Sequence, residues 1–152
     1  SPTQRTLAWA RKLGWDVATL ERWNSWAKIR QDIFGLDLLA LTGTEAIGIQ
    51  VTSTANVSAR REKLDGLPTT AKLLAAGVRV LVIGWSKRGP RGKVKRWKPV
   101  VYERCASYGA WREWPEECLL VGKCAKGVAT HPRGLEAEGG APPLAGEAAQ
   151  AD

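Results

Sequence analysis

The run VRVLVIGW at residues 78–85 constrains the fold of this chain more than any other segment. Its apolar residues follow one another with almost no polar alternation, which is typical of a strand buried on both faces. A sheet with such a strand has to be covered on both sides. The run therefore favours a layered protein of the α/β (α+β) class.

The segments before this run predict one helix and three strands. Pro2 favours a helix start, apolar residues recur at helical spacing to position 13, and Gly14 is placed to end the helix. Residues 21–32 (ERWNSWAKIRQD) are rich in Trp, Lys and Arg, and we expect a loop there. The predicted strands are residues 15–20, 36–41 and 47–52.

The segments after the third strand predict a helical crossover and two further strands. A cap at residues 54–56 begins a helix that Gly66 and Pro68 break in two, and Gly77 ends it. The run at 78–85 follows, and a last core strand is expected near residues 98–104. The order α-β-β-β-α-β, with one more strand, predicts a mixed central β-sheet flanked by helices.

The chain divides into three parts by composition. At 152 residues it is long enough for one domain with a sizeable core. We expect that domain at residues 1–104, a C-terminal extension at 105–131, and a tail at 132–152. The tail is rich in Gly, Ala, Pro and Glu, a composition typical of disordered segments.

The overall charge favours an anionic partner. Lys and Arg number 23 against 15 Asp and Glu, for a net charge of +8. Such a surplus favours binding to nucleic acid, although solvated surface charge has the same composition. No apolar run is long enough for a membrane span, and the N-terminus has no hydrophobic signal core. With only three cysteines, reduced thiols in the cytoplasm are expected.

Two basic segments are candidates for nucleic-acid contact. Residues 86–98 (SKRGPRGKVKRWK) hold seven basic residues and no acidic ones, as in a flexible loop or hairpin tip between two strands. Residues 21–32 hold further basic residues, and Trp23 and Trp26 there are candidates for base stacking. The tryptophans at 9, 15, 85, 111 and 114 favour core packing instead. The basic residues expected to bind nucleic acid are Lys28, Arg30, Lys87, Arg88, Arg91, Lys93, Lys95 and Arg96.

A small polar cluster is predicted where the second and third strands run side by side. In residues 47–52 the odd positions are apolar, so Gln50 and Thr52 point to the opposite face of that strand. Asp37 lies on the neighbouring strand. A structural reading remains open, in which Asp37 is a turn carboxylate and Gln50 and Thr52 form a hydrogen-bonded pair.

These residues carry a resemblance to a known family. The α-β-β-β-α-β order, with G-x-D at residues 35–37 and Q-x-T at 50–52, resembles the restriction-endonuclease-like core of the PD-(D/E)xK nuclease superfamily. The resemblance covers about residues 3–103. Residues 3–60 are similar to small nuclease-like proteins of phages and mobile elements, and more distantly to archaeal-type Holliday junction resolvases.

The resemblance implies a Mg²⁺- or Mn²⁺-dependent DNA endonuclease that hydrolyses phosphodiester bonds, with junctions or flaps as possible substrates and a homodimer as its expected state. It implies that Asp37 and Gln50 bind the metal and that Thr52 occupies the position of the motif lysine. Glu21 is expected to complete the metal shell, and Asp32 is a weaker candidate. The residues expected to supply the missing positive charge are Arg60 and Lys63.

Two departures from the family pattern leave other functions open. Gln50 has no charge and Thr52 is not a cation, which suits a catalytically inactive nuclease-fold module that only binds nucleic acid. A factor that binds an acidic protein is a third possibility. Cys105, Cys118, Cys124 and His131 match no strong zinc signature, so ordinary thiols are expected.

Overall fold

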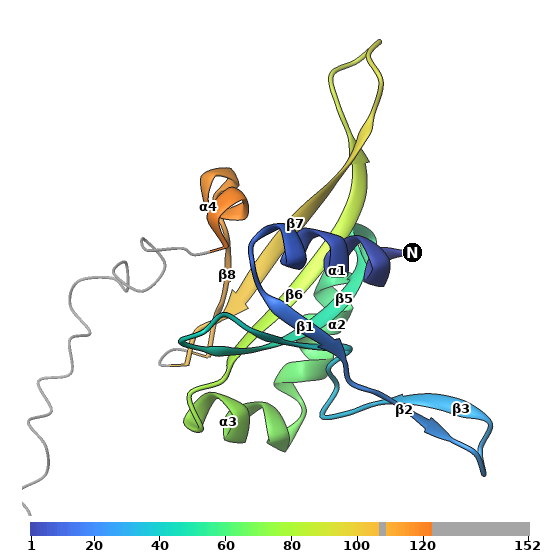
Figure 1. Ribbon diagram of the computed structural model, residues 1–152, viewed down its shortest axis with the longest axis vertical. Coiled ribbons are helices and arrows are strands. Elements are labelled where there is room, and N and C mark those ends of the chain that lie inside the picture. Colours follow the sequence, from blue (N-terminus) through green and yellow to red (C-terminus); the bar gives the residue numbers. More distant parts are fainter. Residues whose placement is uncertain (107–108, 123–152) are drawn as a thin grey trace, which may run out of the picture.

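The computed structural model describes residues 1–106 and 109–122 (Figure 1). Its helices and strands, in chain order, are α1 (Pro2–Lys12), β1 (Asp16–Thr19), β2 (Glu21–Asn24), β3 (Ile29–Asp32), β4 (Leu38–Leu41), β5 (Ala46–Ser53), α2 (Val57–Asp65), α3 (Pro68–Ala75), β6 (Arg79–Arg88), β7 (Arg96–Arg104), β8 (Trp111–Glu113) and α4 (Glu116–Val121). A short 3-10 turn, Thr54–Asn56, joins β5 to α2. The tail at 132–152, Cys124 and His131 lie outside the described residues.

Six of the strands form one mixed sheet in the order β1-β4-β5-β6-β7-β8. Strands β5 and β6 are parallel and are joined through α2 and α3, whereas all other neighbours in this sheet are antiparallel. The predicted mixed central sheet flanked by helices is therefore confirmed. The predicted α-β-β-β-α-β order is also present, as α1-β1-β4-β5-α2-β6, with the β2–β3 pair inserted after β1.

The sheet is covered by helices on both faces. One core cluster joins α1 and α4 to the sheet, and the other joins α2 to the opposite face. Strand β6 contributes to both clusters, with Leu81 and Ile83 in the first and Val80 and Val82 in the second. These four side chains are fully buried, which confirms that the run at 78–85 is covered on both sides.

Local sequence accounts for the way α1 and β5 are placed. The Ser1 hydroxyl accepts the backbone N–H of Gln4 at 3.3 Å, and Gly14 takes the left-handed conformation just after α1, with φ of 78°. On β5, a Cβ at Gly48 would come within 2.5 Å of the Leu36 side chain. This glycine lets the segment before β4 lie close against β5, which is where Asp37 is held.

Residues 21–32 are not the predicted loop. They form a two-stranded antiparallel hairpin, β2–β3, that projects from one edge of the molecule (Figure 1). The Asn24 side chain stabilises its turn by accepting the backbone N–H groups of Trp26 and Ala27, both at 3.1 Å. Glu21 therefore begins β2. The prediction was wrong because charged residues on both faces hide the strand periodicity.

The basic segment at 86–98 is a hairpin rather than a loop. Strand β6 runs to Arg88 and pairs there with Arg96, the first residue of β7. The two strands extend well beyond the body of the sheet and form a long arm (Figure 1). Residues 86–98 are called the basic arm below.

The residues after β7 add to the same core. Strand β8 pairs with β7, and Trp114 and Cys118 are buried in the cluster that also contains α1. Trp15 and Trp85 are buried there as well, as predicted for core tryptophans. No helix in the described part of the chain combines the length and apolar character needed to cross a membrane.

Candidate functional site

Asp37 is fixed between two strands by its backbone. Its N–H donates to the carbonyl of Ile49 on β5 at 2.9 Å, and its carbonyl accepts the N–H of Leu20 at 2.8 Å. The residue directly precedes β4, so the ends of β1 and β4 and the middle of β5 meet around it. Its carboxylate is therefore held by the sheet itself and not by a loop.

The Asp37 carboxylate is bonded through one oxygen only. Oδ2 accepts the side-chain amide of Gln50 at 2.6 Å and the backbone N–H of Val51 at 2.7 Å. Within the described ranges no donor reaches Oδ1. The structure thus brings Asp37 and Gln50 together, as strand alternation predicts, and leaves one carboxylate oxygen available to a ligand.

Gln50 has an oxygen in need of a partner. The side chain is only 2% exposed, and Oε1 is buried without a hydrogen bond. A half-turn of the amide would exchange Oε1 with Nε2 and place the oxygen beside Asp37. Two acceptor oxygens repel each other at hydrogen-bond distance, so this arrangement is stable only when a cation or a proton lies between them. Oxygen is also the ligand that Mg²⁺ and Mn²⁺ prefer, so the pair of side chains fits a hard cation.

Several of the residues that the sequence singles out act on Asp37 through their charges. Burial raises the pKa of Asp37 to about 6, while the hydrogen bond from the Val51 N–H lowers it. The negative charges of Asp32 and Glu21 raise the pKa of Asp37 further, and the positive charge of Arg60 lowers it. The structure therefore gathers three acidic residues and one arginine at this point of the sheet.

Glu21 and Asp32 reach the site from the base of the β2–β3 hairpin. They are direct cross-strand partners, so both side chains point to the same side of the hairpin. Each is already paired with a basic residue: Arg30 Nη1 lies 2.7 Å from Glu21 Oε2, and Lys63 Nζ lies 3.1 Å from Asp32 Oδ2. Both pairs are tertiary contacts that the sequence did not predict.

The two candidates for a missing cation differ in their surroundings. Lys63 is engaged with Asp32, whereas no described carboxylate forms an ion pair with the guanidinium of Arg60. Thr52, at the position of the motif lysine, is 7% exposed and lies opposite Gly84 on β6. Of these residues, Arg60 is the one whose charge acts on Asp37 without a competing carboxylate.

The described residues form no complete cage of acidic or imidazole ligands. Among the described residues, no three His, Cys, Asp or Glu side chains come together in an arrangement that could hold a metal ion. Cys118 lies in the core on α4, and Cys105 is half-buried after β7. Any cation at this site would therefore depend on Asp37 and the Gln50 amide, with Glu21 or Asp32 released from its basic partner.

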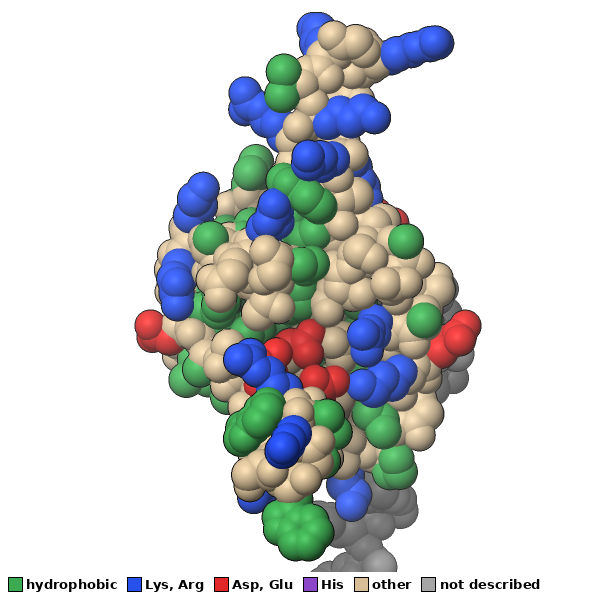
Figure 2. All heavy atoms as spheres, turned by 90° about the vertical axis from the view of Figure 1, so that its right-hand side faces the viewer, with side chains coloured by type: hydrophobic (Ala, Val, Ile, Leu, Met, Phe, Trp, Pro, Cys, Tyr) green, Lys and Arg blue, Asp and Glu red, His purple; other side chains and the backbone are tan. Residues whose placement is uncertain are grey.

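Basic side chains flank this acidic group. Figure 2 shows acidic side chains at the centre of one face, with the basic arm above them and the β2–β3 hairpin below. The arm residues predicted to bind nucleic acid are all exposed, as are Lys28 and Arg30 on the hairpin. Trp97, in the arm, is 44% exposed, and the Arg5 guanidinium lies 4.0 Å from its ring centre.

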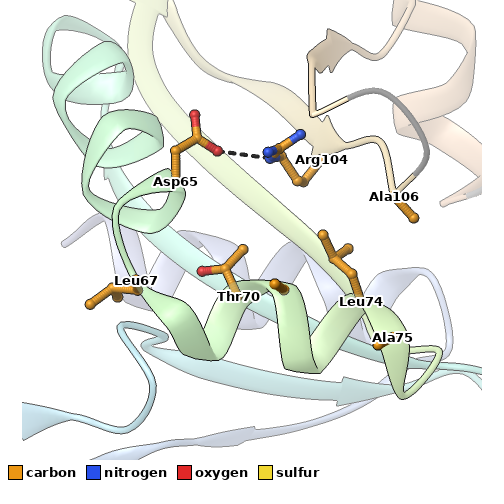
Figure 3. A pocket seen from close by; sticks show the side chains of 8 residues that line it. Asp65, Leu67, Thr70, Leu74, Ala75, Arg104 and Ala106 are labelled. Atoms are coloured by element: carbon orange, nitrogen blue, oxygen red, sulfur yellow. Dashed lines mark hydrogen bonds and ion pairs between the residues drawn. The ribbon is translucent and has the colours of Figure 1, made fainter.

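A separate pocket lies on the α3 side of the sheet. Its volume is about 300 Å³, and it is lined by residues of α3 together with Asp65, Arg104 and Ala106 (Figure 3). An ion pair of 2.7 Å joins Arg104 to Asp65 at its edge. None of the residues around Asp37 lines this pocket. No local sequence pattern predicts it, because its lining comes from three separate parts of the chain: the end of α2, α3 and the end of β7.

Comparison with known proteins does not assign a family. No family model matches the chain, and no curated protein or solved structure matches it. What the site does has to be inferred from the residues around Asp37 and from the order of the strands and helices.

Proposed function

We propose that this protein is a metal-dependent DNA endonuclease of the PD-(D/E)xK type, with its active site at Asp37. The observation that carries the proposal is the contact between Asp37 and Gln50 on adjoining strands. Each of these side chains has one oxygen without a hydrogen bond from the described residues. With the Gln50 amide turned so that Oε1 faces Asp37, the pair would offer the oxygen ligands that a hard divalent cation prefers.

The topology supports the same proposal. The superfamily that the sequence resembles has an α-β-β-β-α-β core, and α1-β1-β4-β5-α2-β6 follow that order here. In this core the two motif positions fall on neighbouring antiparallel strands, as Asp37 and Gln50 do beside β4 and β5. The inserted β2–β3 hairpin brings Glu21 and Asp32 to the same place.

Asp37, Gln50 and Glu21 would hold Mg²⁺ or Mn²⁺ at this site. When bound, the cation would lower the pKa of a water molecule and offset the charge of the scissile phosphate. The Asp37 carboxylate would be kept ionised by the cation, against the burial that raises its pKa to about 6. Because Gln50 brings no charge, we expect weaker metal binding than at a site with two carboxylates.

Arg60 would supply the positive charge that Thr52 lacks. Its guanidinium acts on Asp37 and has no described carboxylate partner, so it is available to a phosphate oxygen. Lys63 would serve in its place only after leaving Asp32. The Thr52 hydroxyl would at most orient a water molecule or a phosphate oxygen.

The basic arm would hold the DNA backbone beside the site. Its seven basic residues have no acidic residue among them, and a chain of net charge +8 attracts polyanions. Such contacts position a duplex without reading its sequence. On the strength of the resemblance alone, we also propose that the protein is cytoplasmic, is encoded by a phage and acts as a homodimer.

One observation favours a second function, a nuclease-fold module that binds DNA without cutting it. Both motif positions on β5, Gln50 and Thr52, are neutral, and Glu21 and Asp32 are occupied by Arg30 and Lys63. A site in this state would bind metal poorly. Binding to DNA through the basic arm would be unaffected.

Cleavage assays separate the two functions. Labelled linear, flapped and four-way-junction DNA would be incubated with the protein in Mg²⁺, in Mn²⁺ and in EDTA, with Asp37→Ala in parallel. The nuclease is supported if metal-dependent cutting occurs and disappears in Asp37→Ala, while an Asp16→Asn control on β1 still cuts. If all three proteins bind the DNAs and none cuts, the binding module replaces the enzyme.

A further inference from the structure

The β2–β3 hairpin exposes two tryptophans. Trp26, in its turn, is 97% exposed, and Trp23 on β2 is 59% exposed. Large aromatic side chains are usually covered, because they have the most apolar surface to remove from water. Two indoles left in solvent on one small hairpin are a candidate contact surface for a partner.

The turn presents Trp26 in a defined way. Asn24 Oδ1 accepts the N–H groups of Trp26 and Ala27, and Lys28 adopts a left-handed conformation with φ of 52°. These features are those of a formed turn between two paired strands. The exposure of Trp26 therefore results from the hairpin structure and needs no unfolded segment.

Strand register places Trp23 on the same side of the hairpin as the acidic residues of the site. Trp23 pairs with Arg30, and Glu21 pairs with Asp32, in one antiparallel ladder. Direct partners and residues two positions apart share a side, so all four side chains point the same way. This set, Glu21, Trp23, Arg30 and Asp32, is called the aromatic side of the hairpin below.

The aromatic side is continuous with the surroundings of Asp37. At the base of the hairpin, the N–H of Leu20, the residue before Glu21, donates to the Asp37 carbonyl at 2.8 Å. Ile33, the residue after Asp32, forms a β-bridge with Leu36 beside Asp37. A nucleotide chain that leaves Asp37 along this side would meet Arg30 and Trp23, and then Trp26 at the tip. The side chain of Arg30 is 73% exposed, so its guanidinium is accessible to a phosphate.

The combination of flat aromatic and basic side chains suits unpaired nucleotides. A free base stacks on an indole whatever its sequence, while a base in a duplex is already stacked between its neighbours. The basic arm, across the acidic group from the hairpin (Figure 2), has a high charge density suited to a duplex backbone. The two projections thus fit the two parts of a DNA in which single and double strands meet.

We infer that the β2–β3 hairpin stacks unpaired bases of DNA on Trp23 and Trp26, so that the site receives substrates in which a single strand adjoins a duplex. This inference rests on the proposed function and names its substrate class. It gives the inserted hairpin a role that the α-β-β-β-α-β core lacks.

Equilibrium binding in EDTA tests the inference without cleavage. Fluorescence anisotropy would compare a blunt duplex with a forked duplex of equal length that carries single-stranded arms. For Trp26→Ala and Trp23→Ala we expect about tenfold weaker binding to the fork and less than about twofold change on the duplex. Leu120→Ala is the matched control, because it removes an exposed apolar side chain far from the hairpin in sequence. Leu120 lies on α4 and is 80% exposed.

Conservative variants separate stacking from general apolar contact. Trp26→Phe keeps an aromatic ring and should lose much less fork binding than Trp26→Leu. A 2-aminopurine in the single-stranded arm should lose its fluorescence on binding to the wild type, and keep more of it with Trp26→Leu, because stacking quenches the base. Folding is not at risk, since Trp26 has almost no contact with the rest of the chain.

The outcomes distinguish this inference from the proposed function. Equal losses on fork and duplex, or no loss on either, would overturn the stacking role while leaving the nuclease intact if metal-dependent cutting is seen. Failure to bind any DNA at low salt would overturn both. Fork-selective binding that needs the tryptophans, without cutting in metal, would support the hairpin's role and replace the nuclease with the binding module.

Discussion

The β2–β3 hairpin and the basic arm lie on opposite sides of the acidic group (Figure 2) and carry different chemistry. The arm has seven basic residues and no carboxylate, and its Trp97 is in contact with the Arg5 guanidinium and less exposed than Trp23 or Trp26. The hairpin has two acidic residues, Glu21 and Asp32, where it joins the body of the protein, and an exposed tryptophan, Trp26, at its turn. The arm suits any anionic backbone, whereas the hairpin requires a flat, unpaired base. A substrate preference can therefore arise from the hairpin although most of the charge is in the arm.

The largest effect is expected from reversing charge in the arm. Lys93→Glu combined with Lys95→Glu should weaken binding by about a hundredfold on forked and duplex DNA alike, because the lost contacts are to phosphates. The salt dependence of binding should also become shallower. Anisotropy titrations at several salt concentrations measure both quantities.

The matched control for the arm changes the same charge elsewhere. Arg11 and Lys72 are exposed on α1 and α3, and their replacement by Glu should reduce binding far less. If the two double variants lose affinity equally, net charge rather than the arm attracts DNA. The contrast between the arm and the hairpin would then be lost.

A smaller effect is expected from a change at the centre, between the two projections. Gln50→Glu restores a carboxylate beside Asp37 and should strengthen Mn²⁺ binding by about tenfold, since ligand charge sets affinity for hard cations. Titration calorimetry without DNA measures this directly. Gln31→Glu on β3 adds the same charge at an exposed residue and should leave Mn²⁺ affinity nearly unchanged. Equal affinities for wild type and Gln50→Glu would place the cation elsewhere.

The smallest effect concerns the stability of the metal-free protein. The pKa of Asp37 is raised from 3.8 to about 6, so the folded state binds a proton more readily than the unfolded state. The Asp37 carboxyl therefore makes stability fall as pH rises from about 4 to 6, with no further change above. Asp37→Asn removes this loss of stability and should stabilise the protein at pH 7 by about 1 kcal/mol. This gain is smaller than that expected for a fully buried carboxyl, because solvent screens a carboxyl that is only partly buried.

Thermal unfolding in EDTA between pH 4 and 8 checks this sign. The difference in Tm between Asp37→Asn and the wild type should be small near pH 4, grow up to about pH 6 and then stay level. Asp16→Asn, at an exposed residue of β1, should show no such dependence. If Asp37→Asn is less stable than the wild type at pH 7, the ionised Asp37 carboxylate stabilises the fold and the expected sign is wrong.

Local patterns account for what the sequence predicted correctly. The run at 78–85 predicted a doubly covered strand because its apolar residues follow one another, and β6 is that strand. Alternation along residues 47–52 placed Gln50 on the face opposite Ile49 and near Asp37, where the structure has it. Both features depend on neighbours in the chain and on the repeat of two residues in a strand.

Tertiary contacts account for what it did not predict. The hairpin at 21–32 was hidden because its charged residues on both sides conceal a strand pattern. Only the cross-strand pairing of β2 with β3 defines it. The ion pair between Lys63 and Asp32 joins residues 31 positions apart, so no local pattern distinguishes Lys63 from Arg60. That distinction came from the ion pair that joins α2 to the hairpin.

The most direct test of the central claim is the single-turnover rate of forked-DNA cleavage as a function of Mn²⁺ concentration, for the wild type and Asp37→Asn. We predict that the cleavage rate of the wild type rises with Mn²⁺ concentration and then saturates. Asp37→Asn should bind the fork in EDTA as the wild type does and should not cut it. Cutting by Asp37→Asn at the wild-type rate, or cutting by the wild type in EDTA, would contradict the assignment of the active site to Asp37.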